Sequence, residues 1–94
     1  MYKRQSGKLV ERVQTGVRME KRILGVCKAL ADMYGITLGD LLEGIVLHAF
    51  EGKPPFGAEA LAKIKALRQA FDLDLVAKDS HKLVERSARR GDAS

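Results

Sequence analysis

The sequence predicts a mainly α-helical domain in which one short strand precedes the helices. Three observations lead to this prediction. Apolar and polar residues alternate over residues 12–19, which is the period of a half-buried strand. From residue 20 the apolar spacing changes to three and four residues, which is helical. The one strand has no partner strand in its own chain, so its backbone groups must be paired elsewhere.

Length and composition indicate one folded domain, or one small domain with an appendage. The chain has 94 residues, of which 46% are hydrophobic and 31% charged, and neither fraction is typical of disordered or membrane proteins. No apolar run approaches the ~20 residues that span a bilayer. The start, Met1–Gln5, leads into no apolar signal segment, and one cysteine forms no internal disulfide. We therefore expect a cytoplasmic protein with no membrane partner.

The formal charge of +5 is unevenly distributed. Residues 1–22 hold seven basic and two acidic groups, residues 23–52 hold one and four, and residues 53–94 hold nine and six. A basic N-terminal region on a less basic body favours a polyanionic partner. A solubilising tail is the alternative interpretation. We expect residues 1–11 to form a flexible basic arm.

The two sides of the expected strand differ in chemistry. One side is apolar or small and the other is mostly polar. The first comprises Val13, Thr15, Val17 and Met19, and the second Arg12, Gln14, Gly16 and Arg18. The simplest partner for such a strand is the same strand of a second copy, paired antiparallel about a two-fold axis.

Two helices are expected after the strand. The first covers residues 20–34 and ends at Gly35, the usual stop residue. Thr37 is a good N-cap for the second, over residues 38–51. This second helix is apolar around most of its circumference and needs burial on two faces. So short a chain cannot supply both, which is a second reason to expect a homodimer.

The remaining chain is predicted to form a C-terminal helical extension over residues 53–88. A break at residues 52–57 precedes a helix over 58–71, and a weaker helix over 76–88 is anchored by Leu83 and Val84. The stripe of the first consists of Leu61, Ile64, Leu67 and Phe71. Two roles stay open: to cover the apolar helix over 38–51, or to join dimers into higher oligomers. Residues 89–94 are expected to be a disordered tail.

The ordered combination over residues 12–51 resembles the ribbon-helix-helix family of Arc- and MetJ-type DNA-binding dimers. The resemblance rests on a short alternating strand, a helix, a glycine–hydrophobe–hydroxyl turn and a second apolar helix. Here these read Val17-Arg18-Met19, Ile23 through Ala31, Gly35-Ile36-Thr37, Asp40-Leu41-Leu42 and Ile45-Val46. The rest of the chain lies outside the resemblance.

The resemblance implies a homodimer whose intermolecular ribbon enters the major groove of double-stranded DNA. The base-reading residues would be Arg12, Gln14, Gly16 and Arg18. Arginine pairs with guanine and glutamine with adenine, whereas glycine at the central position departs from the family. Phosphates would meet Lys8, Lys21, Arg22, Thr37, Leu38 and Gly39. The dimer core would comprise Val13, Thr15, Val17, Met19, Leu41, Leu42, Ile45 and Val46.

The function expected on this basis is transcriptional regulation, as by a repressor. An alternative is an antitoxin or another protein-interaction module whose residues 58–88 bind a partner protein, and a purely structural dimer is a third. The polar strand residues could be ordinary outward side chains, and Thr37 a cap alone. No catalytic residues, cofactor or metal site are expected, because His81 and its neighbouring carboxylates lack a metal-ligand spacing.

Overall fold

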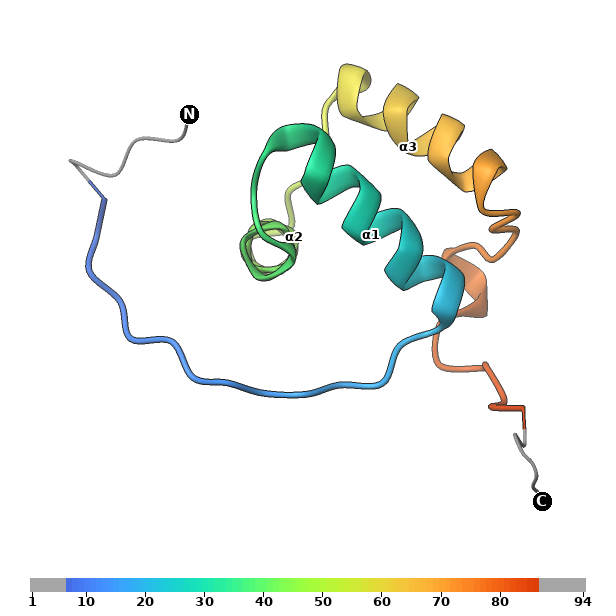
Figure 1. The fold of residues 1–94 in the computed structure, drawn as a ribbon, viewed down its shortest axis with the longest axis horizontal. Helices are drawn as coiled ribbons and strands as arrows, with labels where there is room; N and C mark the ends of the chain where they lie inside the picture. The colour runs from blue at the N-terminus through green and yellow to red at the C-terminus, as the bar shows by residue number, and fades with distance from the viewer. Residues whose placement is uncertain (1–6, 87–94) are drawn as a thin grey trace.

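The computed structural model describes residues 7–86, which are mainly helical, as predicted. Three α-helices follow one another in the chain: α1 (Lys21–Tyr34), α2 (Leu38–Phe50) and α3 (Ala58–Ala70). A single 3-10 turn, η1, covers Ala77–Asp79. Helix α1 lies between the other two and packs against both (Figure 1). The bounds agree with the three expected helices to within one residue at each end.

Helix α1 begins with its own acidic cap. The carboxylate of Glu20 accepts hydrogen bonds from the backbone N–H groups of Arg22 and Ile23, both at 2.9 Å. The helix dipole disfavours cations in the first turn, where Lys21 and Arg22 lie. The Glu20 carboxylate offsets that cost and satisfies two N–H groups that the helix itself leaves unpaired.

The turn between α1 and α2 forms as predicted. Gly35 adopts a left-handed conformation, with φ of +67°. The N–H of Ile36 donates to the carbonyl of Ala31 at 3.0 Å, which closes the Schellman pattern typical of a helix end at glycine. Thr37 then caps α2, because its hydroxyl oxygen accepts from the N–H of Asp40 at 3.0 Å.

The core of the described chain is small. Four hydrophobic residues are buried: Val26, Leu30, Ala31 and Leu41. Half-buried residues from all three helices and their connections pack against the last three of these: Cys27, Ile36, Ile45, Phe56, Ile64 and Leu67. The apolar stripe predicted for α1 therefore forms the core, and Cys27 lies at its margin as a packed small hydrophobe.

Helix α2 keeps much of its apolar surface exposed. The exposed fractions of Val46, Leu47 and Phe50 are 44%, 63% and 80%. The C-terminal extension does not cover this surface, because α3 packs on α1 instead. At the end of α3, the ring of Phe71 lies against Gly25 in the middle of α1.

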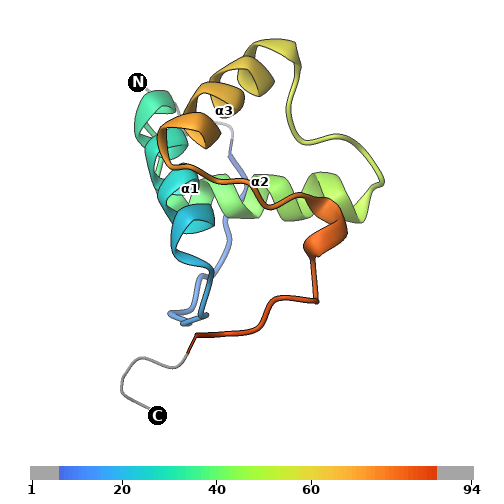
Figure 2. The same cartoon turned by 90° about the vertical axis from the view of Figure 1, so that its right-hand side faces the viewer.

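Residues 12–19 form no strand within the described chain. They run in an extended path that leaves the start of α1 and passes clear of the helices (Figures 1 and 2). Their backbone groups make no hydrogen bond with any other described residue. A strand requires a neighbour for its hydrogen-bond ladder, and residues 7–86 of a single copy offer none.

The helix predicted over residues 76–88 is wrong for residues 76–86, and residues 87–88 lie outside the described part. Only η1 forms there, capped by the Asp79 carboxylate, which accepts from the N–H of Val76 at 2.8 Å. The two expected anchors, Leu83 and Val84, are 50% and 93% exposed. A short helix needs an apolar face to bury, and within residues 7–86 these side chains have no surface to pack on.

The two ends of the chain were expected to be flexible. Residues 7–11 of the basic arm are exposed and carry no secondary structure. Residues 1–6 of that arm, and the expected tail over 89–94, lie outside the described residues.

Candidate nucleic-acid interface

The four expected base-reading residues lie on the extended segment before α1. All four, Arg12, Gln14, Gly16 and Arg18, are exposed. Space alone does not require a glycine at residue 16, because a Cβ there would meet nothing within 4 Å. The segment therefore presents an open backbone and several polar side chains, without a fixed surface behind them.

Both arginines of this group contact carboxylates of the same chain. Arg12 donates from Nε and Nη2 to the two carboxylate oxygens of Glu43 in α2, at 2.8 and 2.7 Å. These hydrogen bonds and the charge of Glu43 raise the pKa of the Arg12 guanidinium. Arg18 forms an ion pair with Glu85, close to the end of the described chain. DNA would have to replace these carboxylates to engage the arginines.

The start of α2 is the expected phosphate site of the helical part. The N–H groups of Leu38 and Gly39 make no hydrogen bond with other described residues. Free N–H groups and the positive end of the helix dipole favour an anion at such a position. The Thr37 hydroxyl is already engaged as the N-cap, because its oxygen accepts from the N–H of Asp40. The negative charge of the Asp40 carboxylate, in the first turn of α2, weakens the attraction of this helix start for anions.

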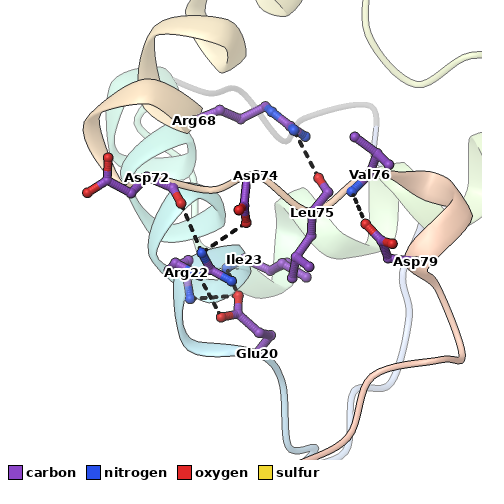
Figure 3. Close-up of polar contacts among 9 residues, drawn as sticks. All are labelled: Glu20, Arg22, Ile23, Arg68, Asp72, Asp74, Leu75, Val76 and Asp79. Carbon is purple, nitrogen blue, oxygen red and sulfur yellow. Dashed lines mark hydrogen bonds and ion pairs between the residues drawn. The ribbon is translucent and has the colours of Figure 1, made fainter.

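Arg22, which the sequence indicated as a phosphate contact, makes several contacts within the described chain (Figure 3). Its Nε donates to Glu20 at 2.8 Å, and its Nη1 donates to the carbonyl of Asp72 at 2.9 Å and to the carboxylate of Asp74 at 3.1 Å. The side chain thus joins the start of α1 to the turn that follows α3. Lys8 and Lys21, the other cations expected to touch phosphate, are exposed.

The contacts of Arg22 also set the charge state of this junction. The side-chain hydrogen bond from Arg22, together with the N–H groups of Ile23 and Arg22, lowers the pKa of the Glu20 carboxyl. The same hydrogen bond raises the pKa of the Arg22 guanidinium. The pair is therefore charged throughout the neutral range.

Further hydrogen bonds hold the chain after α3 (Figure 3). Arg68 donates from Nη2 to the carbonyl of Leu75 at 2.9 Å, and Asp79 caps η1 through Val76. Sequence reasoning missed this arrangement. The sequence contains the acidic residues Asp72 and Asp74, but their position beside Arg22, some 50 residues earlier in the chain, depends on tertiary packing.

The expected dimer-core residues divide into two groups. Leu41 is buried in the chain's own core, with Leu42 and Ile45 half-buried beside it. The others are all at least one-third exposed: Val13, Thr15, Val17, Met19 and Val46. The structure thus brings part of the group together within one chain and leaves the rest uncovered.

Comparison with family models, with curated proteins and with solved structures gives no match to this chain. Within residues 7–86, no helix has the length and apolar character needed to cross a membrane. The same residues hold no group of three or more His, Cys, Asp or Glu side chains placed to bind a metal ion.

Proposed function

We propose that this chain is a homodimeric DNA-binding protein of the ribbon-helix-helix type, and that it regulates transcription by reading the major groove with an intermolecular ribbon. One observation carries the proposal. The segment over 12–19 enters α1 as an extended chain with an unpaired backbone and with exposed apolar side chains on alternate residues. Such an edge is a template for pairing with another strand.

The exposed apolar surface supports a second copy as the partner. Val13 and Val17 are 81% and 73% exposed, and alternation puts them on one side of a strand. In a two-fold pair this side would face Val46 and its neighbours on α2. Full burial of a side chain of this size contributes about 1.5–3 kcal/mol. Dimerisation would thus cover surface that a single chain of this length leaves in water.

The opposite side of the same segment supports DNA as the ligand. Arg12, Gln14 and Arg18 would project outward from the ribbon, and each can form two hydrogen bonds with a base edge. The free N–H groups at the start of α2 would bind a backbone phosphate and fix the register. Gly16 would let the ribbon backbone approach the groove closely.

Selection from a random duplex library at near-physiological salt tests the proposal. We expect enrichment of a symmetric, paired motif, because a two-fold dimer reads two half-sites. Arg18→Ala should weaken binding and relax the preference at one base pair of each half-site. Lys28→Ala, which removes an exposed charge from α1, is the matched control and should keep the preference. Unchanged affinity and preference in Arg18→Ala would contradict ribbon reading.

A second candidate function, binding of a protein partner as in an antitoxin, finds support in the last described residues. Leu83 and Val84 are exposed on a segment without helix, and such segments often fold on a partner. Helix α3, in contrast, already packs on α1. Amide hydrogen exchange distinguishes the two parts. Slow exchange in α3 with fast exchange over 80–86 would confine partner binding to the last segment, and fast exchange throughout would extend it to residues 58–86.

A further inference from the structure

We infer that Glu85 is a built-in competitor of DNA: the segment after α3 holds its carboxylate against Arg18, and DNA must displace it before that arginine can read a base. The inference rests on the proposed function and concerns the regulation of the same site. It starts from the ion pair between Arg18 and Glu85, which joins the segment that precedes α1 to the segment that follows η1.

The position of Arg18 in this pair is set by its neighbours. It lies two residues before Glu20, whose carboxylate is fixed by the first N–H groups of α1 and by Arg22. This end of the extended segment therefore stays next to α1 whether or not the rest pairs with a second copy. Arg12 has no comparable anchor, because its contact with Glu43 reaches across to α2.

The start of the segment that carries Glu85 is held by the same arginine. Arg22 also binds Asp72 and Asp74, so the chain after α3 starts beside the residues that fix Arg18. The hydrogen bonds of Arg68 and Asp79 then hold residues up to η1. From η1 the chain turns back toward the extended segment (Figure 2), where Glu85 meets Arg18. Arg22 thus contacts both Glu20, two residues after Arg18, and the turn from which the segment that carries Glu85 begins.

Glu85 differs in charge sign from the ionised residues that surround it in the sequence. It is the only acidic residue among residues 80–86, which also contain the cations Lys82 and Arg86. The net positive charge of residues 80–86 would favour binding to DNA, whereas the Glu85 carboxylate neutralises Arg18, a base-reading residue in the proposed function. Deleting the segment would therefore mix two opposite effects, and Glu85→Gln separates them because it removes the negative charge alone.

The expected effect is a graded attenuation of DNA binding. Both members of the pair are mostly exposed, with side-chain exposures of 80% and 69%, and exposed ion pairs contribute little. Their usual strength corresponds to about a 1.5- to 5-fold change in affinity per protomer. A dimer that engages both half-sites would gain about 2- to 25-fold on loss of the two carboxylates. Salt screens the pair, so the gain should be largest at low ionic strength.

The experiment is a double-mutant cycle on the full chain, with DNA affinity measured at low and near-physiological salt. The proteins are the wild type, Glu85→Gln, Arg18→Ala and the double variant. Glu51→Gln is the matched control, because Glu51 is 67% exposed and pairs with Lys53 at 3.2 Å, away from the reading residues. We expect Glu85→Gln to tighten binding, Glu51→Gln to leave it unchanged, and Glu85→Gln to gain nothing once Arg18 is absent.

The outcomes separate this inference from the proposed function. An equal gain from Glu85→Gln with and without Arg18 would indicate a general charge effect and overturn the inference. No gain from Glu85→Gln, with binding still weakened in Arg18→Ala, would overturn it while leaving the DNA-binding proposal intact. Failure of both the wild type and Glu85→Gln to bind any duplex would overturn both.

Discussion

The aromatic ring of Phe71 lies directly over the backbone of Gly25. A Cβ atom at residue 25 would be 2.6 Å from Cε1 of that ring and 2.9 Å from Cδ1, closer than real Cβ contacts come. Glycine in the middle of a helix costs about 1 kcal/mol relative to alanine. The close approach of Phe71 explains why α1 nonetheless has a glycine at residue 25. The same contact ties the end of α3 to the centre of α1.

Substitution of this glycine should reveal the contact. Alanine in an open helix position stabilises by about 0.5–1 kcal/mol relative to glycine. We expect Gly25→Ala instead to destabilise by about 1 kcal/mol, since an added methyl group in a packed site forces its neighbours to move. Urea denaturation of the variant and the wild type measures the difference.

The matched comparison uses the same substitution without the ring. In a Phe71→Ala background, Gly25→Ala should recover the ordinary gain in helix stability, because nothing then opposes the methyl group. If Gly25→Ala stabilises the protein with Phe71 in place, the ring does not pack on this glycine in solution.

Local signals in the sequence were sufficient for α1, α2 and α3. Gly35 and Thr37 predicted the turn between α1 and α2 because each acts through hydrogen bonds to residues within five positions. The apolar spacing over α1 likewise predicted three of the four buried residues, Val26, Leu30 and Ala31. Such short-range chemistry is readable without knowing the fold.

The tertiary contacts of the extension were not readable in the same way. Arg22 looked like a free cation in a basic region, but it binds Asp72 and Asp74 far along the chain. Leu83 and Val84 suggested a helix, yet whether an apolar pair forms one depends on a surface to pack against. The carboxylate neighbours of Arg12 and Arg18 are also products of the fold, because Glu43 and Glu85 lie 31 and 67 positions from their partners.

The cap of α1 should make stability depend on pH at the acid side. The pKa of Glu20 is lowered in the folded chain, chiefly by its hydrogen bond with Arg22. The ionised carboxylate therefore stabilises the fold above the ordinary carboxyl pKa, and this contribution is lost as pH falls through the lowered value. Urea denaturation of the wild type and of Glu20→Gln from pH 7 to pH 3 should give two curves that converge toward acid. A constant gap between them would contradict the role of this carboxylate.

The lone thiol should react slowly in the folded protein. Cys27 packs beside the core, and burial raises the pKa of its thiol. Thiol reagents attack the thiolate, so both the lower thiolate population and the restricted access slow the reaction. We expect alkylation near neutral pH to be slower in buffer than in denaturing urea. Equal rates under the two conditions would place Cys27 in open solvent.

Dimerisation should make stability depend on protein concentration. If two copies fold together, dilution favours the unfolded chains and lowers the melting temperature. Val46→Lys places a charge on the exposed apolar side of α2, and we expect it to abolish both the dimer in sedimentation and the concentration dependence. Leu61→Lys is the matched control, because Leu61 is 53% exposed on α3, outside the expected dimer core. A melting temperature that is independent of concentration in the wild type would mean that no second copy covers the apolar side of α2. The segment over 12–19 would then have no partner strand with which to form the proposed ribbon.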